Sequence, residues 1–397
     1  MVPVDAPARR VLHGSRVGAG DLIELDGSAG EGGGQILRTA LTLSAATLRP
    51  FAVRRVRANR MKPGLRPQHR EAARSMAGLC DALLEGAEVG SSHVVFRPRR
   101  RPEPGERVLD IGTAGSAPLL FQTLAPALAL AGGESRLTLR GGTHQDHAPS
   151  FHYLALVWAP AVARLGFPME LALQTAGFYP EGGGEFSATV RPAHAMPPLD
   201  LAHRGMLVET QVLSLVAGLD LAVAERQGER AARRLREMGV SAEVRCVPVP
   251  ARLSRGSHLL VVATFERTRS GHGAVSAHGR NAEAVADAAV DGLAAFLAGR
   301  AAVDRHLGDQ LVLPAGLVAA GLVPPVPGVI PTTRFTVSEV TRHLTTVAEV
   351  VRRFLPVRIE IQGDEGEEGE VRIGPAPGAS LGHAPGAAEA VTPARGR

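Results

Sequence analysis

The stretch Asp26-Gly27-Ser28-Ala29-Gly30 recurs, slightly altered, as Asp110-Ile111-Gly112-Thr113-Ala114-Gly115. The same succession of elements is predicted after each copy: a helix, a strand, a polar loop, a second helix and closing strands. The predicted ranges are 36–48, 51–56 and 68–84 after the first copy, and 119–131, 136–140 and 151–165 after the second. Self-similarity at this period is typical of one supersecondary unit used more than once. Equivalent loops of such units meet where ligands usually bind.

A third, fainter copy is predicted towards the C-terminal end. Its helices and strands are expected at 309–322, 334–337, 344–354, 357–361 and 370–373. In the last helix Leu344, Val347, Val351 and Phe354 fall at near-helical spacing and form one apolar face. His343 stands just before this face, and the equivalent helix of the first unit begins near His69.

These patterns predict an α+β fold built from α/β repeats. Three repeated units, each with two helices on a mostly four-stranded sheet, would pack their helices inward and their sheets outward. A smaller α+β domain is inserted between the second and third units, with predicted elements at 206–213, 221–238, 242–247, 258–264 and 282–297 and a Gly/Ser/His-rich stretch before the last helix. The predicted divisions are a flexible arm (1–20), units one and two (21–202), the inserted domain (203–300), unit three (301–374) and a disordered tail (375–397).

Composition excludes several classes of protein. The chain is 45% hydrophobic and 21% charged, which is ordinary for a globular protein, and its 4% of aromatic residues disfavours a base-stacking platform for single strands. No apolar run reaches the roughly 20 residues of a membrane span, and the N-terminal segment lacks the apolar core of a secretory signal. Cys80 and Cys246 lie far apart, which indicates buried thiols in a reducing compartment. We therefore expect a cytoplasmic protein without a membrane partner. The net charge of +5 is compatible with a polyanionic substrate.

Two neighbouring stretches could hold phosphate. Glu31-Gly32-Gly33-Gly34-Gln35 precedes a predicted helix, whose free N–H groups favour anions, although the loop is not a Walker A motif and could be only a tight turn. The basic stretch that follows contains Arg54, Arg55, Arg57, Arg60, Lys62, Arg66 and His69. It is either a phosphate cradle or a solvated face. Lys62 is the one lysine among 44 basic residues. Either this ratio reflects only a coding bias toward arginine, or a compact ammonium group is needed at this position.

Histidines raise three further interpretations. His343 at a helix start would be kept neutral by the helix dipole, as a nucleophile requires, although most such histidines are surface or capping residues. His306-Leu307-Gly308-Asp309-Gln310 precedes a helix, and Asp309 could simply be its N-cap. His144, His147 and His152 with Asp146 resemble a metal-binding set, but their spacing matches no standard site, so we predict none there. Glu181-Gly182-Gly183-Gly184 is interpreted as a turn or bulge.

Taken together, these segments resemble the RNA 3'-terminal phosphate cyclase family over about residues 21–361. The resemblance is carried by Asp26 to Arg38, Arg57 to Leu65, Gly112 to Ser116 with Gln122, Gly177 to Gly184, Leu307 to Leu311, His343-Leu344 and Arg353 to Pro356, in unbroken order. It departs from the family at Ala176, where a basic residue is usual, and at the extra His144 and His147. Many ordered motifs make the resemblance specific.

The resemblance implies a ligase that uses ATP and a divalent ion (Mg²⁺ or Mn²⁺) to convert an RNA 3'-terminal phosphate to a 2',3'-cyclic phosphodiester. In this family a histidine attacks the α-phosphate of ATP, AMP passes from it to the RNA 3'-phosphate, and the 2'-hydroxyl then displaces AMP. By position, His343 matches the nucleophile, and the ATP contacts match Gln122, His306, Leu307, Gly308, Asp309 and Gln310. Glu31 matches a metal ligand, and the residues near phosphate match Arg38, Arg57, Arg60, Lys62 and His69. The family also suggests a homodimer.

Three alternatives remain open from the sequence. A non-catalytic cyclase-like RNA-binding or ribosome-assembly protein would have the fold without the nucleophile, so His343 counts against it. An enolpyruvyl transferase has a related repeat architecture but needs neither ATP nor a nucleophilic histidine. A plain RNA-binding protein would use only the basic loop.

Overall fold

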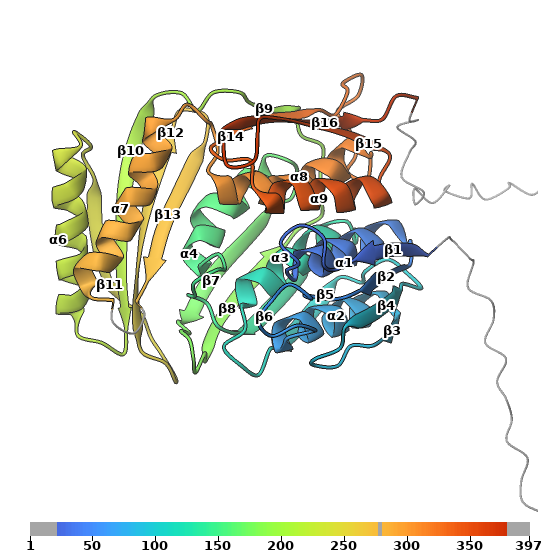
Figure 1. Cartoon of the computed structure of the whole chain (residues 1–397), viewed down its shortest axis with the longest axis horizontal. Coiled ribbons are helices and arrows are strands. Elements are labelled where there is room, and N and C mark those ends of the chain that lie inside the picture. Colours follow the sequence, from blue (N-terminus) through green and yellow to red (C-terminus); the bar gives the residue numbers. More distant parts are fainter. Residues whose placement is uncertain (1–21, 277–279, 379–397) are drawn as a thin grey trace, which may run out of the picture.

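The part of the chain that the structure describes forms four four-stranded sheets, each with parallel and antiparallel strand pairs, and helices pack against these sheets (Figure 1). The computed structural model describes residues 22–276 and 280–378. The predicted α+β class is confirmed at this level. The arm predicted over 1–20 and the tail from residue 379 onward lie outside the described residues.

The first two sheets have the same strand order and the same strand directions. The first contains β1 (Ile23–Asp26), β2 (Phe51–Arg54), β4 (His93–Arg97) and β3 (Leu83–Glu85), in that order. The second contains β5 (Gly105–Asp110), β6 (Ser135–Gly141), β8 (Gly184–Val190) and β7 (Met169–Thr175). In each sheet the first pair is parallel and the other two pairs are antiparallel.

The helices of these sheets follow the same succession. In the first unit, α1 (Gln35–Thr47) follows β1 and α2 (Pro67–Cys80) follows β2. In the second, α3 (Ala117–Ala129) follows β5, and β6 is followed by a three-part helix formed by α4 (Phe151–Tyr153), the π-helical η1 (Leu154–Trp158) and α5 (Ala159–Ala163).

A third sheet repeats this order with a strand from a distant part of the chain. It contains β9 (Leu199–Leu201), β14 (Thr333–Val337), β16 (Gly369–Pro375) and β15 (Val357–Gln362), again with one parallel pair followed by two antiparallel pairs. Its helices are α8 (Arg305–Ala319) and α9 (Arg342–Phe354). The strand β9 lies within residues 21–202, which the sequence assigns to the first two units, yet it pairs with β14 more than 130 residues later.

The fourth sheet forms a separate lobe, seen at the left of Figure 1. Its strands are β11 (Glu243–Pro248), β10 (Leu207–Ala217), β12 (Gly256–Phe265) and β13 (Arg269–Val275), and its helices are α6 (Leu221–Glu237) and α7 (Ala282–Ala298). The lobe has a hydrophobic core of its own, which includes Val212, Leu259, Val261, Leu293 and Phe296. The Gly/Ser/His-rich stretch, in which the sequence analysis expects no regular element, forms β13 because its small residues pair along β12.

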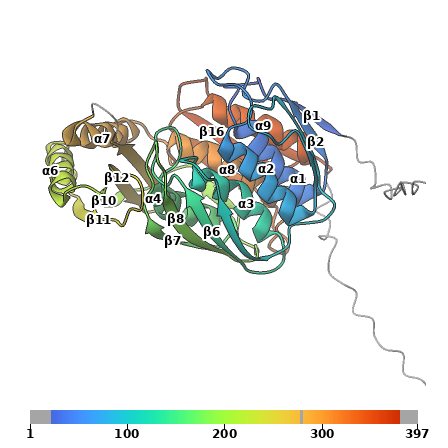
Figure 2. The same ribbon diagram turned by 90° about the horizontal axis from the view of Figure 1, so that it is seen from below.

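The helices of the other three sheets pack against one another at the centre, where α1 contacts α2, α3 and α9, and α8 contacts α9 (Figure 2). Helix α1 is buried around much of its circumference, as expected for a helix between layers. Helix α9 instead buries one stripe that contains Leu344, Val347, Val351 and Phe354, so the apolar face predicted for it is confirmed.

Several predicted boundaries move for identifiable reasons. The helix predicted over 68–84 ends at Cys80 because Asp81 takes a left-handed conformation that terminates it. The helix predicted over 309–322 begins earlier, at Arg305, because Asp304 caps it. The predicted turn at Glu181–Gly184 is confirmed, since Gly182 N–H donates to Phe178 O and β8 starts at Gly184.

Two predictions made from composition, on the cysteines and on membrane-spanning segments, can be compared with the described residues. Cys80 is buried, as predicted, whereas Cys246 is only partly buried, and both are free thiols. Within residues 22–276 and 280–378, no helix has the length and apolarity needed to cross a membrane.

Candidate active site

The N-termini of four helices and the glycine loop meet at one place. Gln35, the first residue of α1, donates from Nε2 to the carbonyl oxygen of His343 in α9 (3.5 Å). A Cβ added to Gly34 would lie 1.9 Å from His69 Nε2 in α2, so only glycine lets the start of α1 approach this imidazole. Helix N-termini carry partial positive charge and unpaired N–H groups, so their convergence favours an anion.

The fourth helix, α8, begins close to His343, and further along it is hydrogen-bonded to α3. His306 in its first turn lies close enough to lower the pKa of His343. Further along α8, Gln310 accepts a hydrogen bond from Gln122 Nε2 of α3 (2.8 Å). The two glutamines predicted as ATP contacts are therefore brought together, although 188 residues separate them.

His343 is the second residue of α9, and its side chain is reachable from solvent. Thr341 caps the helix by accepting from Leu344 N–H (3.0 Å), which fixes the backbone beside the histidine. The ring is 36% exposed, and its Nε2 lies 3.1 Å from Glu31 Oε2. Burial lowers the pKa of His343, Glu31 opposes this shift, and Arg38, Arg60 and His306 add to it. The result is a neutral, accessible imidazole, which is the form that can attack an electrophile.

One cation near this histidine has no carboxylate partner among the described residues, and a buried neutral histidine lies close to that cation. Arg38 of α1 is half-buried and forms no ion pair among the described residues, and burial together with Arg57 lowers its pKa to about 10. His69 is buried, and its pKa lies well below the usual value because of burial and of the nearby Arg38, Arg57 and Arg66. Its Nδ1 accepts from Arg66 N–H (3.2 Å), which leaves Nε2 facing the glycine loop. A buried cation without a partner is costly, so this arrangement suits a bound anion such as phosphate.

The basic loop divides into residues with different positions. Arg60 reaches the site, where a guanidinium nitrogen lies 3.0 Å from Glu31 Oε2. Arg57 donates to the carbonyl oxygens of Lys62 (2.7 Å) and Gly64 (3.0 Å), so it shapes the loop. The Lys62 side chain is exposed on that loop.

The preceding part of the basic stretch does not reach the site. Arg54 and Arg55 form ion pairs with Glu24 and Asp26 on the outer side of the sheet. The interpretation as a solvated face therefore holds for these two arginines.

Within α8, the interpretation of Asp309 as an N-cap is wrong. Asp304 is the cap, because its Oδ1 accepts from the N–H groups of His306 and Leu307 (both 3.0 Å). Asp309 lies inside the helix, where burial raises its pKa well above the usual value and its Oδ1 has no hydrogen-bond partner among the described residues. Leu307 and Gly308 are buried, so the Leu307 side chain does not line the site.

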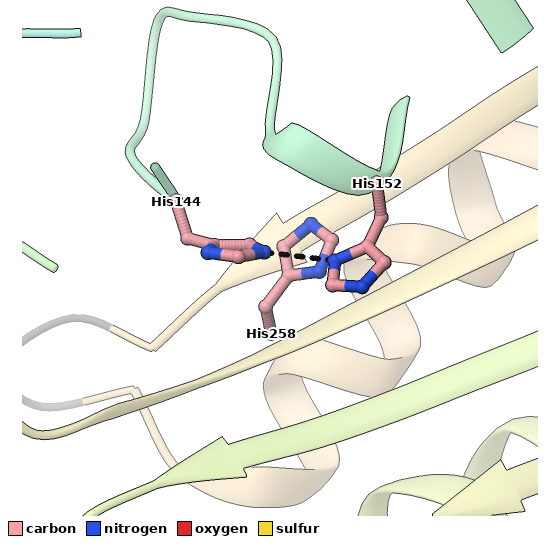
Figure 3. Close-up of side chains that lie close together, drawn as sticks. All are labelled: His144, His152 and His258. Atoms are coloured by element: carbon pink, nitrogen blue, oxygen red, sulfur yellow. Dashed lines mark hydrogen bonds between the residues drawn. The ribbon is translucent and has the colours of Figure 1, made fainter. Parts of the chain in front are cut away.

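The structure also groups histidines that the sequence did not connect. His147 is exposed, and Asp146 lies 3.8 Å from Arg280. His144 and His152 instead meet His258 of β12, which the sequence analysis missed (Figure 3). No local pattern links His258 to the other two histidines, because it belongs to a different sheet.

Comparison with known proteins decides the family. A family model described as RNA 3'-terminal phosphate cyclase matches residues 29–361. The chain belongs to the RNA 3'-terminal phosphate cyclase family. The resemblance found in the motifs is thereby confirmed.

Individual members of the cyclase family match over almost their whole length. The RNA 3'-terminal phosphate cyclase of Methylococcus capsulatus is 39% identical over 359 residues, which cover 89% of this chain and 96% of that protein. The cyclases of Ralstonia nicotianae (42% identical, 86% and 94% covered) and Staphylothermus marinus (38%, 89% and 98%) are similarly related. Among solved structures, the enolpyruvyl transferase NikO from Streptomyces tendae aligns with a TM-score of 0.25 and 15% identity over 43% of this chain and 33% of that chain, which is too weak to support any conclusion.

Proposed function

We propose that this chain converts an RNA 3'-terminal phosphate to a 2',3'-cyclic phosphodiester at the expense of ATP, with His343 as the nucleophile. The observation that carries the proposal is the placement of His343. Its neutral, accessible imidazole stands at a helix N-terminus, 3.1 Å from Glu31 and beside Arg38, which has no carboxylate partner among the residues described. Membership of the cyclase family supports the same reaction.

The proposed reaction has three steps. His343 Nε2 attacks the α-phosphorus of ATP, a P–N bond forms, and pyrophosphate leaves as the bond between the α-phosphorus and the bridging oxygen breaks. An oxygen of the RNA 3'-phosphate then attacks the same phosphorus, which releases the imidazole and leaves AMP on the RNA. Finally the 2'-hydroxyl oxygen attacks the 3'-phosphorus, gives up its proton, and expels AMP as the ring closes.

The residues around His343 have distinct proposed roles. Attack by Nε2 requires the neutral tautomer that carries its proton on Nδ1, so Glu31 Oε2, 3.1 Å from Nε2, would take up any proton on Nε2 before the P–N bond forms. Arg38, Arg60 and His69 hold the β- and γ-phosphates and then the leaving pyrophosphate. Imidazole is a good leaving group while Nδ1 carries its proton, because the ring then leaves phosphorus as a neutral molecule with the lone pair restored on Nε2.

Other predicted contacts lie around this centre. We assign ATP positioning to Gln122 and Gln310, whose amides are held 2.8 Å apart, and to the exposed His306. Leu307 and Gly308 would act through backbone groups, since the Leu307 side chain is buried and Gly308 has none. Arg57 and Lys62 would serve the RNA or phosphate side through the shape and charge of the basic loop.

The residues present also fit a divalent ion. Glu31 Oε1 has no hydrogen bond within residues 22–276 and 280–378, and the buried Oδ1 of Asp309 lacks a partner there while Asp309 lies within electrostatic range of Glu31. Carboxylate oxygens are the ligands that Mg²⁺ and Mn²⁺ prefer. Such an ion, held by Glu31 with Asp309 nearby, would neutralise charge on the triphosphate.

The organisation of the chain is part of the same proposal. Three of the sheets share one strand order, which supports three repeated units with the lobe of residues 203–300 inserted into the third, after β9. We retain the proposed limits 21–202 and 301–374 for the remaining units, apart from the contribution of β9 to the third sheet. A cytoplasmic location and a homodimer remain further parts of the proposal.

The test is covalent labelling. Wild type, His343→Ala and His203→Ala, an exposed histidine outside the site, are incubated with α-phosphate-labelled ATP and Mg²⁺ and separated on a denaturing gel. We expect an acid-labile, alkali-stable label on wild type and His203→Ala that is lost from His343→Ala. Addition of an RNA oligonucleotide with a 3'-phosphate should discharge the label and yield a cyclic end. If folded wild type takes no label, the mechanism is refuted and a non-catalytic RNA-binding or assembly role is favoured.

A further inference from the structure

Three histidines from separate parts of the chain form a cluster away from the candidate active site. His144 follows β6, His152 lies in α4, and His258 lies in β12 of the lobe. One ring nitrogen from each lies within 4.8 Å of the other two. Figure 3 shows the three imidazoles facing one another across the junction between the lobe and the segment that follows β6. We call this set the histidine cluster.

The nitrogen positions approach those of a metal site. His144 Nε2 lies 2.9 Å from His152 Nδ1, and the ring centroids of His144 and His258 are 5.0 Å apart. Nitrogen ligands about 2.0–2.1 Å from a tetrahedral zinc ion lie roughly 3.3 Å from each other. Small rotations of the side chains would bring three such nitrogens onto one ion.

One member of the cluster lacks any other partner. His258 Nδ1 is buried and has no hydrogen bond in the described part of the chain. An unpaired buried nitrogen is costly, so its presence in a packed interior calls for an explanation such as an ion. The adjacent strand leaves the ring room, because a Cβ on Gly273 would lie 3.0 Å from His258 Nε2.

All three imidazoles are in the form that binds metals. Burial lowers the pKa of His152 to about 4 and that of His258 to about 3, and it lowers the pKa of His144 well below its usual value. Each ring is therefore neutral near pH 7 and has a nitrogen lone pair to donate.

Neighbouring groups hold His144 in a ligating orientation. Thr143 Oγ1 lies 2.8 Å from His144 Nδ1 and accepts from Gly177 N–H (2.9 Å), so the far nitrogen of the ring is anchored while Nε2 faces the cluster. Phe178 stacks on the same ring, with centroids 5.3 Å apart and planes at 21°. An outer partner on the second nitrogen is the usual companion of a metal-binding histidine.

We propose that the histidine cluster binds one Zn²⁺ ion, with a fourth position left for water, and that this ion fastens the lobe to the segment following β6. Imidazole ligands suit late first-row divalent ions, and three ring nitrogens with one water give Zn²⁺ its usual tetrahedral set of four ligands. The ion would add to a junction where Phe178 N–H already donates to Ser254 Oγ (2.7 Å).

The test is metal titration of the whole chain, freed of any affinity tag and treated with a chelator. Isothermal titration with ZnCl₂ should show one tight site per chain, and Co²⁺ in its place should give the visible absorption of a nitrogen-ligated, tetrahedral complex. Zinc should also raise the unfolding temperature, because it binds only the folded chain.

Substitutions separate this cluster from other zinc ligands. His258→Gln and His152→Gln should each weaken Zn²⁺ binding at least about 100-fold, beyond the usual effect of removing an outer partner. His147→Gln, in the same loop as His144 but exposed, should bind as wild type does. His343→Ala should also retain the tight site, which excludes the nucleophile as its ligand.

Either of two results would overturn the proposal. One is a wild type that binds no zinc or gives an octahedral Co²⁺ spectrum. The other is a His258→Gln variant that binds zinc as tightly as wild type. Unfolding temperatures in chelator show whether the variants fold, and the wild-type titration decides the question even where one variant does not. Labelling by ATP is measured separately, so failure of the zinc site and failure of the proposed adenylation are distinguishable.

Discussion

Asp304 joins three parts of the structure through one buried carboxylate, so its replacement by alanine should lower stability sharply. Oδ1 accepts from the N–H groups of His306 and Leu307 at the start of α8 and from the hydroxyl of Tyr153 (2.9 Å). Oδ2 lies 3.4 Å from Gly271 N–H in the lobe. The side chain is buried, so water cannot replace these bonds.

The expected magnitude follows from these contacts. Loss of a helix N-cap costs about 1 kcal/mol. Leaving the buried Tyr153 hydroxyl without its acceptor costs a further 1–3 kcal/mol or so. Asp304→Ala should therefore lower the free energy of unfolding by roughly 2–4 kcal/mol. Asp304→Asn keeps an oxygen acceptor and a good cap, so it should lose less than about 1 kcal/mol.

The assay is urea denaturation of wild type and both variants, followed by far-UV circular dichroism and analysed with a common slope. Covalent labelling with ATP reports whether the start of α8 still forms the site, and Asp304→Ala should label more slowly than Asp304→Asn. The reasoning is refuted if Asp304→Ala unfolds within about 0.5 kcal/mol of wild type, which is the range of an ordinary surface substitution. Equal losses for the two variants would show that the hydrogen bonds are not the cause.

Three further predictions concern the glycine loop and the histidines. Gly34→Ala should displace His69 and slow covalent labelling by ATP. The control is Gly78→Ala in α2, where no atom lies within 4 Å of the new Cβ; it should leave labelling unchanged and stabilise the helix by about 0.5–1 kcal/mol. Equal labelling rates for the two variants would contradict this prediction. The labelling rate should rise with pH through a midpoint below 6.5, since the pKa of His343 is lowered. Glu31→Gln should move that midpoint further down, because the Glu31 carboxylate raises the pKa of His343. An unshifted midpoint in the variant would count against the contact between Glu31 and His343. Chelator-treated protein should become less stable as the pH falls below 6.5, because the unfolded chain then binds protons at histidines that stay neutral in the folded chain. The loss is up to about 1.4 kcal/mol per pH unit for each histidine of lowered pKa. An unfolding temperature that does not change between pH 7 and 5 would refute this prediction. The histidines concerned are His69, His144, His152, His258 and His272.

Local periodicity predicted most helices and strands because each depends on neighbours within one or two turns. The apolar stripe of α9 and the start of α2 near His69 follow from such spacing. The predicted end or start of a helix was wrong where a single residue fixes it. Asp304, rather than Asp309, caps α8. Both carboxylates lie near the start of the apolar pattern, so the sequence alone does not show which of them is the N-cap.

The candidate site was predictable to the extent that its residues lie in ordered motifs. The structure places Glu31, Arg38, Arg60 and His343 together, as phosphate chemistry requires. It separates Arg54 and Arg55 from them: Arg54, the last residue of β2, pairs with Glu24, and Arg55, in a left-handed conformation just after the strand, pairs with Asp26. Charge density along the sequence could not make this distinction, since it does not show which side of the sheet faces the helices.

By itself, the sequence determined the family and the succession of most helices and strands, and it predicted His343 as the nucleophile. Each of these depends on residues that are close together in the sequence or on motifs that follow one another in a fixed order. Only the tertiary structure decided that β9 completes the third sheet and that His258 meets His144 and His152. Such contacts join residues more than 100 positions apart, and they arise from the packing of whole layers, whose geometry no local spacing records.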